Sequence, residues 1–358
     1  MTTTSAGEDA HRPVVPAVPP GVARPLWSVM IPTYNGTAYL REALGSVLAQ
    51  DPGPDAMQIE VVDDSSTEGD PAAVVAEVGG GRVGYFRQPV NRGYIANFAT
   101  CISRSTGHLV HLLHDDDAVR DGFYARLGAG MAARPDAGAG FCRSIYVDPD
   151  GHWQSFTALE RRDAGVLDDW LWKIATGPRL TTPSLVVRRS VYEELGSYDT
   201  RQRFAGEDWE MWVRIATRFP VWYEPLPLAL YRVRREGSLT DTSSRTGEIA
   251  VEMRRAAEII ESYLPDHLPP DQARRMSGYA RAEFARWSTD AAAQLLAAGR
   301  PLAAAGRVRE AWRSSPTLRV AGNLAAGMLA AGTGTGRRLA RRGAVAARRR
   351  IAGSTARR

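Results

Sequence analysis

A strand–loop–helix–strand pattern near the amino-terminal end of the chain constrains its fold most strongly. Short apolar runs at residues 27–31 and 59–62 have the length and composition of buried strands. Residues 38–48 between them repeat apolar side chains at helical spacing, and polar turns follow the two runs at 32–36 and 63–67. This order predicts a βαβ unit with parallel strands, and hence an α/β fold with a mostly parallel sheet flanked by helices.

A third polar cluster follows a further apolar run. Residues 108–114 read as a buried strand, and Asp115, Asp116 and Asp117 come directly after it. Ligands of open parallel sheets bind beyond the carboxyl ends of the strands, so we expect the three polar clusters to meet at one crevice. Crowded carboxylates repel one another unless a cation lies between them, and Mg²⁺ or Mn²⁺ prefers oxygen ligands together with substrate phosphates. A solvated acidic turn is the alternative interpretation of the triplet alone.

Six short segments in one order give the chain a resemblance to a known family. They are Ile-Pro-Thr-Tyr-Asn-Gly at 31–36, Val-Val-Asp-Asp-Ser-Ser at 61–66, Asn-Arg-Gly-Tyr-Ile-Ala-Asn at 91–97, His-Asp-Asp-Asp at 114–117, Gly-Glu-Asp-Trp at 206–209, and Tyr-Arg at 231–232. Together they resemble glycosyltransferase family 2, which has the GT-A fold with a Rossmann-like nucleotide-binding half. The resemblance runs from residue 27 to about residue 240. It implies an inverting transfer of a sugar from a nucleotide-diphosphate donor to an acceptor hydroxyl, with Mg²⁺ or Mn²⁺.

Two other functions use the same sheet. A nucleotidyltransferase would need a loop rich in glycine and basic residues after the first strand, and residues 32–36 do not form one. A catalytically inactive nucleotide-sugar-binding relative would be expected to lack an acidic position, yet every acidic position of the family pattern is filled. The resemblance leaves the donor as a UDP, dTDP or GDP sugar, and the acceptor as a glycan, a lipid-linked molecule or a small molecule.

The first two turns are expected to bind the nucleoside. The resemblance places Pro32 and Tyr34 against it, with the tyrosine ring offering an aromatic face. Asp64 matches the aspartate that accepts a hydrogen bond from the base in uridine-using relatives. Adjacent residues of an extended chain face opposite ways, so Asp63 is the alternative for this contact. A turn cap is the structural interpretation of either carboxylate.

Four further residues are expected on the donor side. Gly93 lets the backbone approach a ligand closely, and Arg92 suits a phosphate. Asn97 lies four residues beyond Gly93, on the same face if a helix begins there. The resemblance also places Arg232 near the donor diphosphate. The structural interpretations are a solvated arginine and a helix cap.

The acidic triplet leaves the metal ligands open, because the family pattern is Asp-X-Asp or Asp-Asp-X and all three positions here are acidic. We expect Asp115 to face the sugar or ribose. Asp117 and Asp115, as the outer pair, are the first choice for metal ligands, with Asp116 as the nearest rival. His111 and His114 flank the triplet, and we expect them to pack rather than to bind metal.

The general base is expected within the Glu-Asp pair at 207–208. A helix follows it, since Trp209 and Trp212 begin a series at helical spacing, and the pair then lies at the positive end of the helix dipole. Inversion by direct displacement requires one carboxylate to take the proton of the acceptor hydroxyl. Asp208 is the first choice and Glu207 the second, with an acidic helix cap as the alternative.

Three tryptophans precede this pair: Trp153, Trp170 and Trp172. Their rings suit the apolar faces of sugars, or they belong to the core.

The chain divides into four predicted parts. Residues 1–25 are rich in proline and small residues, and they read as a disordered leader. Residues 26–245 form the GT-A domain, residues 246–332 a helical extension, and residues 333–358 a basic, disordered tail. Two cysteines do not make a disulfide framework, which suits the cytoplasm.

The basicity of the chain is concentrated at its end. The net charge is +5, and residues 337–358 alone contain nine arginines and no acidic residue. Such a tail suits peripheral contact with an anionic membrane at its inner face. Nucleic-acid binding and a solvated end are the rival interpretations, and no nucleic-acid partner is expected.

Overall fold

The structure is a computed structural model of the 358-residue chain, and it describes residues 9–233, 239–246 and 248–316. The chain divides into two compact units. Of the described residues, the sheet unit comprises 9–170, 180–201 and 214–233, and the helical unit comprises 171–179, 202–213, 239–246 and 248–316.

The elements of the sheet unit follow one another in the order that the sequence predicts. Its strands are β1 (Trp27–Thr33), β2 (Met57–Asp63), β3 (Gly84–Arg87), β4 (Leu109–Leu112), β5 (Ala118–Val119), β6 (Ala139–Val147), β7 (Trp153–Phe156), β8 (Gly165–Val166), β9 (Leu185–Arg188) and β10 (Val221–Arg232). Its helices are η1 (Asp9–His11), α1 (Thr37–Leu48), α2 (Pro71–Gly79), α3 (Tyr94–Arg104), α4 (Phe123–Ala133), η2 (Thr182–Ser184) and α6 (Arg189–Leu195). Helices α5 (Trp170–Ala175) and α7 (Glu207–Ala216) are divided between the units.

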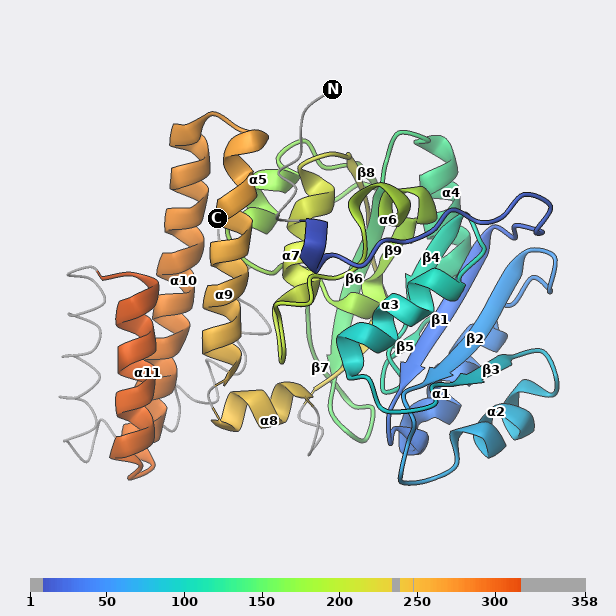
Figure 1. Ribbon diagram of the computed structural model, residues 1–358, viewed down its shortest axis with the longest axis horizontal. Helices are drawn as coiled ribbons and strands as arrows, with labels where there is room; N and C mark the ends of the chain where they lie inside the picture. The colour runs from blue at the N-terminus through green and yellow to red at the C-terminus, as the bar shows by residue number, and fades with distance from the viewer. Residues whose placement is uncertain (1–8, 234–238, 247, 317–358) are drawn as a thin grey trace. The chain divides into compact units, whose positions relative to one another are not determined.

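The sheet has the strand order β3-β2-β1-β4-β9-β6-β10-β5, with β7 on β6 and β8 on β10 (Figure 1). Neighbours β3, β2, β1 and β4 are parallel, as are β6 and β10. Strand β9 lies antiparallel between β4 and β6, so β6 and β10 run in the same direction as the first four strands. Helix α3 packs on β1, β2 and β4, and α4 packs on β6 and β10. The predicted α/β fold with a mostly parallel sheet is confirmed.

The predicted βαβ unit is present, and its register brings the first two polar turns together. All seven residues of β1 are buried, as are the inward-facing residues of α1, including Leu40 and Leu44. Strands β1 and β2 pair so that Thr33 lies opposite Asp63. The turns that follow these two residues therefore begin at the same level of the sheet edge.

Residues 9–25, the described part of the predicted disordered leader, are hydrogen-bonded to the sheet unit. The carbonyl of His11 accepts a hydrogen bond from the Thr200 N–H, and the carbonyl of Pro13 accepts one from the Ser197 N–H. The Arg189 guanidinium donates to the carbonyl of Pro16 at 2.9 Å. A proline-rich extended segment has few hydrogen bonds of its own, so its carbonyls are available to donors elsewhere in the unit. Residues 1–8 lie outside the described residues.

The helical unit contains α8 (Leu239–Thr246), α9 (Glu248–Tyr263), η3 (Leu264–Asp266), α10 (Pro270–Ala297) and α11 (Pro301–Ser314). Helix α10 packs against both α9 and α11. The predicted helical extension is thus confirmed up to residue 314. The remainder of that prediction, at 317–332, and the predicted tail at 333–358 lie outside the described residues. Within the described part of the chain, no helix combines the length and the apolar character needed to cross a membrane.

The boundary between the units differs from the predicted boundary after residue 245. Residues 202–213, which include Glu207 and Asp208, belong to the helical unit. The reason is Trp209, which is fully buried, packs edge-on against Phe284 of α10 at 5.0 Å, and donates from its indole N–H to the carbonyl of Ile174. Because Trp209 buries a large apolar surface against α10, the start of α7 belongs to the core of the helical unit.

Candidate active site

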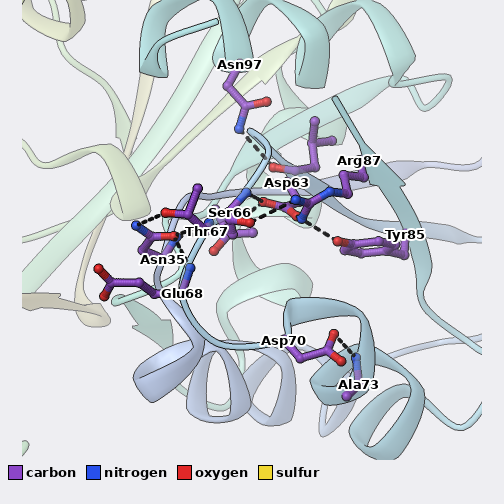
Figure 2. Close-up of polar contacts among 12 residues, drawn as sticks. Asn35, Asp63, Ser66, Thr67, Glu68, Asp70, Ala73, Tyr85, Arg87 and Asn97 are labelled. Carbon is purple, nitrogen blue, oxygen red and sulfur yellow. Dashed lines mark hydrogen bonds and ion pairs between the residues drawn. The ribbon is translucent and has the colours of Figure 1, made fainter. Parts of the chain in front are cut away.

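The turns after β1 and β2 are joined by Asn35, a residue that the sequence analysis did not single out. Its side-chain oxygen accepts hydrogen bonds from the backbone N–H groups of Thr67 and Glu68, at 2.8 and 3.0 Å (Figure 2). Its own N–H donates to the Ser66 hydroxyl at 2.9 Å. Asn35 has a left-handed backbone conformation, with φ of 56°, which asparagine adopts more readily than most residues. The Asn-Gly pair at 35–36 was the available sequence signal for such a turn.

Asp63 holds the second turn and is fully buried. One of its oxygens accepts from the N–H and the hydroxyl of Ser66, and the other accepts from the Tyr85 hydroxyl at 2.7 Å and the Arg87 guanidinium at 2.5 Å (Figure 2). Burial alone would raise the pKa of Asp63, but the hydrogen bonds from Ser66 and Tyr85 and the charge of Arg87 hold that pKa below its usual value. With both oxygens bonded inside the protein, Asp63 caps the second turn, and its predicted contact with the base stays a prediction.

Asp64 joins the second turn to a third turn, the loop between β3 and α3 that contains Arg92 and Gly93. Its two oxygens accept from the backbone N–H groups of Arg92 and Gly93, at 2.8 and 2.9 Å. Gly93 has a φ of +84°, which lets its N–H point at the carboxylate. Burial raises the pKa of Asp64 even though both of these bonds favour the ionised form. The Arg92 side chain is exposed.

Asn97 is bonded inside the protein. Only 2% of it is exposed, and its NH₂ donates to the carbonyl of Val62 at 2.8 Å (Figure 2). Its oxygen accepts from Gln88. These bonds tie α3 to the end of β2 inside the protein. These bonds give Asn97 a structural role, and its predicted donor contact stays a prediction. Pro32 is likewise buried, within β1, whereas Tyr34 is 47% exposed at the sheet edge.

Asp115 is locked against the first turn. The Thr33 hydroxyl donates to its carboxylate at 2.5 Å. A Cβ atom at Gly36 would lie only 1.7 Å from the same carboxylate oxygen, so residue 36 must be glycine for this approach to occur. Thr33, Gly36 and Asp115 thus bring the first turn and the acidic triplet together, as the sequence predicted for the turns as a group.

Asp117 has one carboxylate oxygen bonded and one buried without a donor. The first accepts from the backbone N–H of Arg232 at 2.9 Å, and no hydrogen-bond donor among the described residues reaches the second. Burial, followed by the charges of Asp116 and Asp115, raises the pKa of Asp117 well above its usual value. A buried anionic oxygen without a donor is costly unless a cation compensates it.

Ligand atoms of Asp116, Asp117 and His114 lie within 4.8 Å of one another, so this group could hold a metal ion. Its composition differs from the predicted outer pair, because Asp115 bonds to Thr33 instead. His114 also stacks on Phe98, with ring centroids 5.1 Å apart. His111 is buried between the Tyr124 hydroxyl and the carbonyl of Pro183, and burial lowers its pKa to about 3. His111 therefore packs, as predicted, whereas His114 lies in the candidate metal group.

Arg232 lies beside the acidic triplet and is bonded within the protein. Its side chain is only 2% exposed, and its guanidinium donates to the carbonyls of Asp116, Asp148 and Pro149. It also pairs with Glu42 of α1. All three guanidinium nitrogens are thus bonded inside the protein, and the predicted contact of Arg232 with the donor diphosphate stays a prediction.

Glu207 and Asp208 begin α7 in the helical unit. The Asp208 carboxylate accepts from the Trp209 N–H at 2.6 Å, and burial raises the pKa of Asp208 to about 6. The preceding Gly206 has a φ of +89°, and a Cβ there would lie 3.0 Å from Ala256 of α9. Tight packing of this turn on α9 fixes the start of α7.

The three tryptophans have different environments. Trp170 is a core residue, 3% exposed, and its ring is tilted against that of Phe141 with centroids 4.5 Å apart. Trp172 is 39% exposed, and Trp153 is 56% exposed next to Phe156, with ring centroids 6.0 Å apart. A bulge in the pairing of β6 and β7 places Trp153 and Phe156 on the same side, although their spacing would put them on opposite faces of a regular strand.

The model of the family described as "Glycosyl transferase family 2" matches residues 28–196, the segment that carries the three polar turns and the triplet. Residues 28–196 are a glycosyltransferase family 2 domain. The match includes four of the six motifs, and the motifs at 206–209 and 231–232 lie outside it. The predicted resemblance to the family is confirmed, and the domain is that of a glycosyltransferase.

Known proteins similar to this glycosyltransferase support the same fold. An uncharacterized protein of Mycobacterium tuberculosis (strain CDC 1551 / Oshkosh), MT1568, is 29% identical over 234 residues, which cover 62% of this chain and 70% of that protein. The structure of S. aureus TarS 1-349 in complex with UDP is 16% identical with a TM-score of 0.55, covering 81% of this chain and 92% of that one. The mannosyltransferase PcManGT from Pyrobaculum calidifontis, in complex with GDP-Man and Mn²⁺, is 20% identical with a TM-score of 0.55, covering 90% and 85%. At these identities the two structures establish the fold.

Proposed function

We propose that this glycosyltransferase is an inverting enzyme that moves a sugar from a nucleotide-diphosphate donor to an acceptor hydroxyl, using a divalent metal ion. The observation that carries the proposal is the hydrogen-bonded joining of three strand-end turns and the triplet. Thr33 binds Asp115, Asn35 binds the turn after β2, and Asp64 binds the turn before α3. These contacts gather aromatic, basic and acidic side chains at the sheet edge where open parallel sheets bind ligands.

The donor is held by the exposed members of this group. Tyr34 offers its ring to the nucleoside, and Arg92 offers a guanidinium suited to a phosphate. Asp64, bonded to Arg92 and Gly93, sets the position of the turn that carries this arginine and remains the candidate acceptor for the base N–H. TarS has been crystallised with UDP and the mannosyltransferase with GDP-Man, so UDP and GDP are the first nucleotides to compare.

Asp116 and Asp117, with His114, are the residues that would hold Mg²⁺ or Mn²⁺. The fit rests on the buried Asp117 oxygen that lacks a donor and on the closeness of the three ligand groups. The bound ion would neutralise charge on the leaving nucleoside diphosphate. Asp115, held by Thr33 and Gly36, keeps its carboxylate fixed and faces the ribose or sugar.

Asp208 is the proposed general base. The acceptor oxygen bonds to the anomeric carbon as the bond from that carbon to the diphosphate oxygen breaks, and the hydroxyl proton passes to the carboxylate. A base with a pKa of about 6 is ionised at neutral pH and is still basic enough to accept a proton. Glu207, 7% exposed, is the second choice.

The proposal is tested by thermal stabilisation with UDP, dTDP and GDP, each with Mn²⁺, with Mg²⁺ and with a chelator. We expect one nucleotide to raise the unfolding temperature only when a divalent ion is present. A donor sugar carrying that nucleotide should then be hydrolysed slowly, releasing the nucleoside diphosphate. Metal-dependent binding without any release would indicate the inactive relative, and binding of a nucleoside triphosphate alone would indicate a nucleotidyltransferase.

A further inference from the structure

Arg232 makes hydrogen bonds to the acidic triplet through both its backbone and its side chain. Its backbone N–H donates to the Asp117 carboxylate at 2.9 Å, and its Nε donates to the carbonyl of Asp116 at 2.9 Å. Arg232 therefore binds the side chain of Asp117 and the backbone carbonyl of Asp116.

The other guanidinium nitrogens reach two further segments. One donates to the carbonyls of Asp148 and Pro149, at 3.0 and 2.9 Å, in the turn between β6 and β7. The other pairs with Glu42 on α1 at 2.5 Å, and the guanidinium lies over the Tyr39 ring, 4.4 Å from its centroid. Helix α1 begins directly after the first polar turn. The arginine thus connects the triplet to α1 and to the β6–β7 turn.

We propose that Arg232 is a positioning residue that holds Asp116 and Asp117 in the arrangement that receives the metal ion, and that it does not itself contact the donor. This inference rests on the proposed metal-dependent function. The geometry supports it because the planar guanidinium has five N–H donors in a fixed fork, and here they point at carbonyls and a carboxylate of three different segments. Lysine keeps the charge but cannot make this set of directed bonds.

The charge of Arg232 has a second effect on the triplet. Three consecutive carboxylates repel one another when no metal ion is bound. A buried guanidinium beside them offsets part of this repulsion, so the acidic turn can keep one conformation before the ion arrives. Less rearrangement is then needed when the ion binds, which is the physical basis of pre-organisation.

Arg188 provides a matched control. It lies on β9 opposite Leu109, at the other end of β4 from the triplet, and it donates to the carbonyls of Ala137, Met131 and Arg134. A structural arginine bonded to three carbonyls is therefore available outside the site. Arg188→Lys measures what the loss of such a network does to folding alone.

The test compares wild type, Arg232→Lys and Arg188→Lys by Mn²⁺ titration, with free Mn²⁺ followed by electron paramagnetic resonance, in the presence of UDP or GDP. We expect Arg232→Lys to raise the Mn²⁺ concentration for half-saturation at least tenfold, and Arg188→Lys to leave it within twofold. Weak nucleotide binding in the presence of a chelator should be the same in all three proteins. If it falls selectively in Arg232→Lys, the arginine touches the phosphates and the inference is overturned.

Two further outcomes are distinguishable. A wild-type protein that binds the nucleotide without any Mn²⁺ effect would refute the metal part of the proposed function and this inference with it. If Mn²⁺ promotes nucleotide binding in the wild type, and Arg232→Lys needs no more Mn²⁺ than the wild type, the inference is refuted and the proposed function stands. If Arg232→Lys fails to fold, Glu42→Gln takes its place, since Glu42 is 47% exposed and its loss removes one arm of the network. We expect a several-fold rise in the Mn²⁺ requirement, and no rise would overturn the proposal.

Discussion

Asp208→Asn should stabilise the protein while it removes most of the activity. Burial raises the pKa of the Asp208 carboxyl from 3.8 to about 6, so the folded protein holds an ionised group that its surroundings disfavour. Asparagine has nearly the same shape and can still accept the hydrogen bond from the Trp209 N–H. It carries no charge, however, and cannot take a proton from an acceptor hydroxyl.

The size of the stabilisation follows from the pKa difference. A rise of roughly two pKa units corresponds to about 3 kcal/mol of destabilisation at pH values above the folded-state pKa. Asp208 is only partly buried, and solvent screening reduces this figure to about 1–2 kcal/mol. The difference in stability between variant and wild type depends on pH. Because the pKa of Asp208 is higher in the folded protein than in the unfolded chain, the wild type becomes less stable as the pH rises from about 4 to 6. The variant therefore gains most at pH 7–8 and nothing below about pH 4.

The assay is thermal or urea unfolding of both proteins from pH 4 to pH 8, together with turnover. We expect the two stability curves to meet below about pH 4, to separate between about pH 4 and pH 6, and to stay apart at higher pH. Turnover of the variant should fall on the order of a hundredfold. Wild-type turnover should rise with pH through about 6, because the base works in its ionised form. An Asp208→Asn protein that is less stable than wild type at pH 8, with no convergence at low pH, would refute the burial argument. A fully active Asp208→Asn with an inactive Glu207→Gln would transfer the role of base to Glu207.

Three other predictions concern the sheet unit and the tail. Asp117→Ala should abolish the effect of Mn²⁺ on nucleotide binding without unfolding the protein, measured by thermal shift, and Asp115→Ala should weaken nucleotide binding; unchanged metal-stimulated binding in both would contradict the assignment of the triplet. Asp63→Asn should cost about 3 kcal/mol at pH 7 in urea unfolding, because it leaves buried donors unpaired, and the difference should shrink as the pH falls through the lowered pKa of Asp63; a neutral substitution would show that the network is dispensable. Deleting residues 337–358 should release the protein from anionic vesicles at low salt, since each arginine near the lipid contributes on the order of 1 kcal/mol, while donor hydrolysis persists; a full-length chain that ignores such vesicles would leave the tail without this role.

The arrangement of the sheet could be predicted because its signals are local and agree with one another. Apolar runs of strand length, the helical spacing of residues 38–48 and the polar turn after each run all indicate parallel strands with their carboxyl ends together. The packing of His111 was also predictable, since a histidine inside an apolar strand is usually buried. These inferences require only neighbouring residues along the chain.

The roles of Arg232 and Asn97 could not be predicted from residue type. An arginine or an asparagine suits a phosphate or a sugar hydroxyl, and the same donors suit carbonyls of a distant segment equally well. The choice is made by long-range contacts, to Asp148 for one and to Val62 for the other. The unit to which Asp208 belongs was missed for the same reason, since it is decided by the packing of Trp209.

The contact between Gly36 and Asp115 has a consequence for comparing related chains. A single methyl group at residue 36 would occupy the space of the carboxylate, since the two would be only 1.7 Å apart. Any homologue with a side chain at this position must have moved its aspartate or lost it. Residue 36 therefore serves as a marker, readable from sequence alone, for lineages in which the contact between the first turn and the triplet has been remodelled. The substitution Gly36→Ala also offers an inactivated protein that keeps every charged group of the wild type.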